Sequence, residues 1–79
     1  MSSPASTDTR LREIMAEVLD LDPVRIDESF ARGGAPSWDS LAHLRLITAL
    51  EEAFGMRFTM KEVGELDRFS KLRDRLSAL

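Results

Sequence analysis

The segment from Ser40 to Phe54 constrains the fold more than any other part of the chain. Its apolar positions are too many for the single stripe of a surface helix; they are Leu41, Leu44, Leu46, Ile47, Leu50 and Phe54. Asp39 precedes the segment as a preferred N-cap, and Gly55 follows it where a left-handed C-cap glycine is expected. We predict a central helix buried on more than one side. The alternative is that Leu41 and Leu44 belong partly to a contact surface.

A second helix is predicted upstream of this segment. One apolar stripe repeats at i, i+3, i+4, i+7 and i+8, and it consists of Leu11, Ile14, Met15, Val18 and Leu19. Ser6, Thr7 or Asp8 can cap its start. Pro23 is expected to stop it, because the residue before a proline is driven out of the helical region.

The connection between these two helices, residues 21–39, is unusually long for a compact domain, and such loops are often functional. We expect Ile26 and Phe30 to anchor it to the core, with a short turn at residues 29–32. Further helix is opposed by Gly33, Gly34 and Pro36.

The last third of the chain predicts two more helices. Residues 56–58 alternate too briefly for a strand. Thr59 and Glu62 fit a capping box that opens a short helix ending near Gly64. A final helix after Asp67 has an apolar stripe made of Phe69, Leu72, Leu76 and Leu79. The fold class is therefore all-α: a small four-helix bundle of three main helices and one short one, with a long first loop. Residues 1–5 are expected to be a disordered tail, and residues 6–79 a single domain.

Composition excludes several classes of function. At 79 residues the chain is near the lower limit for a single core. Its net charge of −3 opposes nucleic-acid binding, and the lack of cysteine with only one histidine opposes a metal site. It has neither an apolar run of membrane-spanning length nor a secretory signal. We expect a monomeric cytoplasmic domain that binds no metal, nucleic acid or membrane.

Ser40 lies where a side chain could carry an anion. With Asp39 as N-cap, Ser40 takes the first helical position, near solvent and beside the positive end of the helix dipole. A phosphodiester would be well placed there. By itself, however, a serine at this position is more often simply part of a helix start.

The flanking blocks change that balance. Residues 39–41 read Asp-Ser-Leu, and residues 50–55 read Leu-Glu-Glu-Ala-Phe-Gly. With "DESF" at 27–30 and "LDRFSKL" at 66–72, the chain resembles the acyl carrier protein family over nearly its whole length after Thr7. The resemblance implies an acyl-carrier-like bundle that is not an enzyme.

The same resemblance implies a cofactor and partners. A phosphopantetheinyl transferase would attach 4′-phosphopantetheine covalently to Ser40, between Asp39 and Leu41, and the arm would carry an acyl group as a thioester. Acyl-loading and acyl-processing enzymes would then dock on the central helix. The candidate partner-binding residues are Leu44, Arg45, Glu51 and Glu52.

Departures from the commonest pattern favour a specialised pathway. Residues 36–38 read Pro-Ser-Trp where fatty-acid carriers usually have Leu-Gly-x, and the loop before Ser40 is slightly longer. Arg45 stands where those carriers tend to be acidic. A polyketide-like or secondary-metabolite role fits these departures. Peptidyl or aminoacyl carriers share the fold and cofactor and remain an alternative.

Two other interpretations use the same residues. An enzyme would pair Ser40 with His43 as base and Asp39 as orienter, but the chain lacks a nucleophile elbow. We expect His43 at the solvent edge beside the arm and Trp38 in or near the core. A small helical adaptor, or a nucleic-acid module, would use the basic last helix with Arg68, Lys71, Arg73 and Arg75.

Overall fold

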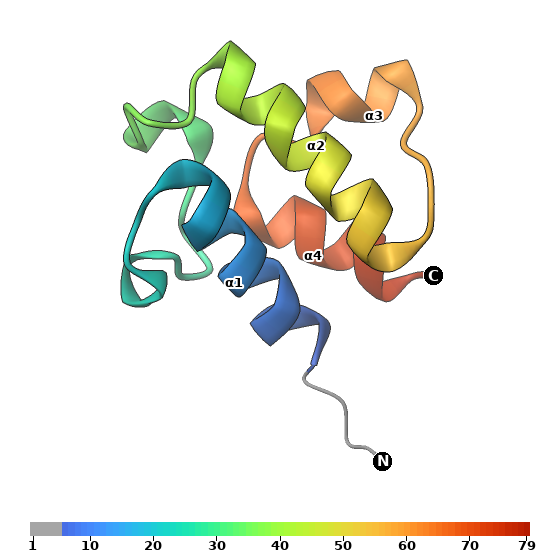
Figure 1. Ribbon diagram of the computed structural model, residues 1–79, viewed down its shortest axis with the longest axis horizontal. Coiled ribbons are helices and arrows are strands. Elements are labelled where there is room, and N and C mark those ends of the chain that lie inside the picture. The colour runs from blue at the N-terminus through green and yellow to red at the C-terminus, as the bar shows by residue number, and fades with distance from the viewer. Residues whose placement is uncertain (1–5) are drawn as a thin grey trace.

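The computed structural model describes residues 6–79, and the expected tail at residues 1–5 lies outside this range. Within it the chain is all-helical, as predicted (Figure 1). Its elements are α1 (Thr7–Leu19), the 3-10 turns η1 (Pro23–Arg25) and η2 (Arg32–Gly34), α2 (Ser40–Phe54), α3 (Met60–Glu65) and α4 (Phe69–Ser77). α1 packs against both α2 and α4. No helix in residues 6–79 is long and apolar enough to span a membrane.

α1 begins where the sequence predicts but ends earlier. The Ser6 side chain caps it by accepting a hydrogen bond from the Thr9 N–H at 3.2 Å. Its end is set by Asp20, which adopts the left-handed conformation at φ 57°, and not by Pro23. Pro23 instead opens η1, where its fixed φ suits the first helical position.

α2 has both predicted boundaries. The Asp39 carboxylate accepts from the Ala42 N–H at 2.8 Å, and Gly55 closes the helix at φ 62°. The face toward α1 is buried and includes Leu46, Ile47 and Leu50. Leu41 and Leu44 lie outside it, 59% and 57% exposed. The helix is thus buried on one broad face, and two leucines remain available for contact with other molecules.

α3 is short, and its start is fixed by the predicted capping box. Thr59 Oγ1 accepts from the Glu62 N–H at 3.1 Å, and Glu62 Oε1 accepts from the Thr59 N–H at 2.9 Å. The second bond and the contact with the Arg75 guanidinium hold the pKa of Glu62 below its usual value. Glu62 therefore joins α3 to α4 at one corner of the bundle.

α4 contributes three of the four apolar residues predicted for its stripe. Phe69, Leu72 and Leu76 are buried. Leu79 is 61% exposed, because α4 ends at Ser77 and the chain leaves the core. Its inclusion in the stripe was wrong.

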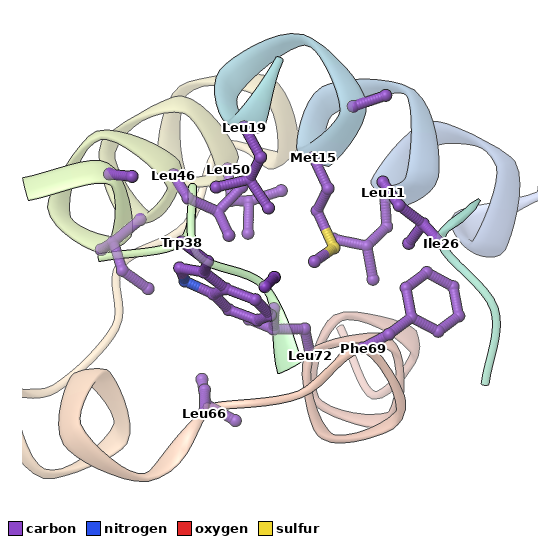
Figure 2. Packing of buried hydrophobic residues seen from close by; sticks show 14 of the residues in the cluster. Leu11, Met15, Leu19, Ile26, Trp38, Leu46, Leu50, Leu66, Phe69 and Leu72 are labelled. Carbon is purple, nitrogen blue, oxygen red and sulfur yellow. The ribbon is translucent and has the colours of Figure 1, made fainter. Parts of the chain in front are cut away.

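The long loop is part of the core, as its apolar anchors predict. Ile26 is fully buried, and Phe30 stacks on Trp38 with ring centroids 5.7 Å apart. Figure 2 shows the Trp38 indole pointing into the core toward Leu72. The loop is also tied to α4 through its backbone, since the Phe69 N–H donates to the Phe30 carbonyl at 2.9 Å.

Candidate functional site

The hydroxyl of Ser40 lies at an exposed helix start. Ser40 is the first residue of α2, at the end that adjoins the long loop (Figure 1). The N–H groups of a first helical turn have no carbonyl partners within their own helix. Asp39 satisfies one of them through Ala42, and the remaining positive potential points outward beside Ser40.

A guanidinium from the loop meets this hydroxyl. Arg32 Nη2 donates to Ser40 Oγ at 2.9 Å, and Arg32 Nε lies 3.3 Å from the Trp38 carbonyl oxygen that it donates to. The backbone N–H of Arg32 also donates to the Asp67 carbonyl, at 2.9 Å. The Arg32 backbone is therefore bonded to the segment just before α4, and its side chain to the residues leading into α2.

A buried series of hydrogen bonds runs from Trp38 through His43 to Val63, next to the start of α2. Trp38 Nε1 donates to His43 Nδ1 at 3.0 Å, and His43 Nε2 lies 2.7 Å from the Val63 carbonyl oxygen. Because an indole N–H can only donate, Nδ1 accepts, and Nε2–H is then the donor to the Val63 carbonyl. Trp38 and His43 are 2% and 5% exposed. Trp38 confirms the core prediction, whereas placing His43 at the solvent edge was wrong.

The enzyme interpretation needs a contact between Ser40 and His43, and the geometry uses both groups otherwise. Each ring nitrogen of His43 already has a partner, in Trp38 or Val63. The recorded side-chain contact of Ser40 is with Arg32. A nucleophile must lie within hydrogen-bond reach of its base, and here the predicted base faces the core. The arrangement gives no support to hydrolysis by Ser40.

The outer face of α2 carries most of the candidate partner-binding residues. Leu44, Arg45 and Glu52 are exposed, and they line a shallow hollow of about 360 Å³ together with Thr48 and Ala49. Glu51 differs from them, because its carboxylate turns inward. Glu51 Oε2 accepts from the Phe58 N–H at 2.8 Å and so fixes the turn after α2.

The basic residues of α4 and of its N-cap are largely neutralised by neighbouring carboxylates. Arg75 pairs with Glu62, and Arg73 pairs with Glu28. Arg68 and Lys71 lie 3.4 Å and 3.5 Å from Asp67. A nucleic-acid module needs a basic surface free to meet phosphates, so this pairing disfavours the nucleic-acid interpretation.

The sequence analysis predicts neither the contact of Arg32 with Ser40 nor the burial of His43. Arg32 comes eight residues before Ser40, across a loop with two glycines, and no periodicity connects them. His43 did carry a signal, since it lies three, four and seven residues before Leu46, Ile47 and Leu50 on the buried face.

The site suits a phosphodiester on Ser40. The hydroxyl is reachable, the helix dipole favours an anion, and a guanidinium already donates to the oxygen that would carry the phosphorus. The Asp39 carboxylate caps α2. The positive charge of Arg32 offsets the repulsion between this carboxylate and a phosphodiester on Ser40.

Comparison with known proteins agrees with this chemistry. A family model described as the phosphopantetheine attachment site matches residues 9–76. No curated protein matches the chain significantly. The family match includes α2 and α3 in full, most of α1 and α4, and the Asp39–Leu41 junction.

Proposed function

Because the chain belongs to the phosphopantetheine attachment site family, we propose that it is an acyl carrier whose arm is attached to Ser40. Domains of this family carry covalently attached 4′-phosphopantetheine and are non-catalytic carriers. The group supplies a thiol that holds cargo as a thioester. The observation that supports Ser40 is its exposed hydroxyl at the start of α2, with the Arg32 guanidinium 2.9 Å away.

Attachment requires a phosphopantetheinyl transferase and coenzyme A. Ser40 Oγ displaces 3′,5′-ADP from coenzyme A: an Oγ–P bond forms, the pyrophosphate P–O bond breaks, and the serine proton passes to a base of the transferase. Asp39 and Leu41 flank the reacting residue. Asp39 keeps the helix start in place, and exposed Leu41 offers the transferase an apolar contact.

Titration of thiols tests the carrier function directly, because the chain has no cysteine. The protein treated with coenzyme A and a broad-specificity transferase should gain one titratable thiol per chain, starting from none. An acyl donor and a loading enzyme should then remove that thiol, and hydroxylamine should restore it. The adaptor interpretation, in which the chain has no cofactor, predicts no thiol under conditions that load a control carrier.

The cargo belongs to a specialised pathway in this proposal. Trp38 donates a hydrogen bond to buried His43, and the extended loop places Arg32 at Ser40. The residues that depart from the fatty-acid pattern therefore have structural roles here. Polyketide-like or secondary-metabolite chemistry is the first candidate. A peptidyl or aminoacyl carrier uses the same arm and fold and is the second.

Partner enzymes should dock along a strip on α2, defined here as Leu41, Leu44, Arg45, Thr48 and Glu52. These positions follow i, i+3, i+4, i+7 and i+11, so they share one face of the helix. The strip is apolar near Ser40 and acidic at its far end. Transient encounters of this kind suit a small interface steered by charge. Glu51 is not part of the strip, because its carboxylate accepts a hydrogen bond from the Phe58 N–H. Its role in this proposal is to stabilise the turn after α2.

Arg45 should select the partner. It is exposed within the strip, and a like charge across an interface disfavours a wrong partner. Arg45→Glu should slow cognate loading and speed recognition by fatty-acid synthesis enzymes, each by about 3–10-fold at low salt and less at moderate salt. Arg25→Glu, on exposed η1, is the matched control and should change neither rate. Equal rates for Arg45→Glu and wild type with both enzyme sets would remove Arg45 from partner selection.

Monomeric state and a cytoplasmic setting complete the proposal. Ser40 directly precedes the strip on α2, so a single chain presents the whole site. A carrier must also meet soluble transferase and processing enzymes.

A further inference from the structure

Arg32 has a place at the site that attachment alone does not explain. It lies in η2, between the loop anchor Phe30 and the start of α2. Its side chain makes two recorded hydrogen bonds, to the Trp38 carbonyl and the Ser40 hydroxyl. A guanidinium has five N–H donors, so donors remain for an additional acceptor. Within residues 6–79, Arg32 forms no ion pair with a carboxylate.

This lack of a carboxylate partner distinguishes Arg32 from the two half-buried arginines of α4. Arg73 and Arg75, also half-buried, pair with Glu28 and Glu62. Arg32 instead places its charge against a neutral hydroxyl. Hydrogen bonds from a guanidinium to an anion are shorter and stronger than those to a neutral acceptor, and a phosphate can be held by two parallel bonds.

The backbone that carries the Arg32 side chain is held in place before any modification. The Arg32 N–H is bonded to the Asp67 carbonyl at 2.9 Å, and Ala31 forms an isolated bridge with Arg68. The Ala35 N–H donates back to the Arg32 carbonyl at 3.1 Å, which closes the η2 turn. Less side-chain freedom is lost when such a prepositioned group binds its anion.

We propose that Arg32 is a phosphate-holding residue, whose guanidinium binds the phosphodiester between Ser40 and the pantetheine arm. The inference rests on the proposed attachment at Ser40. In the unmodified protein Arg32 donates to the hydroxyl, and after modification it donates to the phosphate oxygens. The base of the arm is then fixed against the loop, and the added negative charge beside Asp39 is offset.

Nuclear magnetic resonance of the wild type tests the contact without any substitution. The side-chain Nε–H signal of Arg32, assigned with Arg32→Lys, should shift when the unmodified protein becomes modified, while that of Arg25 should not. The phosphorus resonance of the modified protein should move in Arg32→Gln and stay in Arg25→Gln. Arg25 is a suitable control because it is exposed and lies in the other 3-10 turn.

A thermodynamic cycle gives the size of the coupling. The unfolding equilibrium constants of modified and unmodified protein are compared for wild type, Arg32→Gln and Arg25→Gln. Modification should be less favourable to the folded state in Arg32→Gln than in wild type by about 2–5-fold at low salt, the size expected of an exposed ion pair. At 1 M salt the difference should largely disappear, and Arg25→Gln should match wild type.

The outcomes separate this inference from the proposed function. Modified wild type with an unshifted Arg32 signal, together with no coupling in the cycle, overturns the phosphate contact and leaves attachment at Ser40 intact. Slower loading of Arg32→Gln with an unchanged modified state also overturns it, and assigns Arg32 to the encounter with the transferase. If the wild type gains no phosphopantetheine arm, the proposed function itself is wrong. Should Arg32→Gln fail to fold, the wild-type shift and Arg32→Lys decide.

Discussion

Replacing Trp38 with alanine should lower the free energy of unfolding by about 3–5 kcal/mol, as removal of a buried aromatic side chain does. Trp38 is 2% exposed and stacks on Phe30. Its indole N–H also supplies the donor that His43 Nδ1 accepts. Domains of this kind have a total stability of about 5–15 kcal/mol, so the variant should lose much of its stability. Far-UV circular dichroism during denaturant unfolding measures the change.

Trp38→Phe separates packing from hydrogen bonding. The phenylalanine keeps an aromatic ring on Phe30 but leaves His43 Nδ1 without its donor, which should cost about 1–3 kcal/mol. Val24→Ala, at an 81% exposed position, should change stability by less than about 0.5 kcal/mol. Equal stability of Trp38→Ala and Val24→Ala would contradict both the buried position of the indole and its hydrogen bond to His43.

Ser40→Ala should abolish attachment of the arm completely while the domain remains folded. The Ser40 side chain is exposed and its recorded contact is one hydrogen bond from Arg32, so stability should change by less than about 0.5 kcal/mol. No other hydroxyl at the loop–α2 junction has the same position: Ser37 lies in the loop before Trp38. Ser37→Ala is therefore the matched control, and it should gain one thiol as the wild type does. A thiol on Ser40→Ala would move the attachment point elsewhere.

Local signals in the sequence predict most of the helix boundaries. Asp39, Gly55 and the Thr59–Glu62 capping box each act through the backbone of their own turn, and such effects can be read from a few neighbouring residues. The predicted end of α1 is wrong because two local signals compete there. Asp20 ends the helix in a left-handed conformation that aspartate adopts only occasionally, so Pro23 was the stronger local signal.

The parts of the site that the sequence does not predict depend on contacts across the fold. Arg32 reaches Ser40 from a backbone position that is bonded to Asp67, which is distant in the sequence. The position of His43 near Ser40 in the chain suggests a solvent-edge residue, but its helical register places it inward, where it is buried. Glu51 matched a family block, but its bond to the Phe58 N–H depends on how the chain turns after Gly55.

Fragment-ion mass spectrometry of the modified wild type tests the central claim most directly. The protein is treated with coenzyme A and a broad-specificity phosphopantetheinyl transferase, then digested, and the modified peptide is sequenced. We predict the mass of one 4′-phosphopantetheine per chain, with the added mass on Ser40. An unmodified protein under conditions that load a control carrier, or an arm located on any residue other than Ser40, would contradict the account.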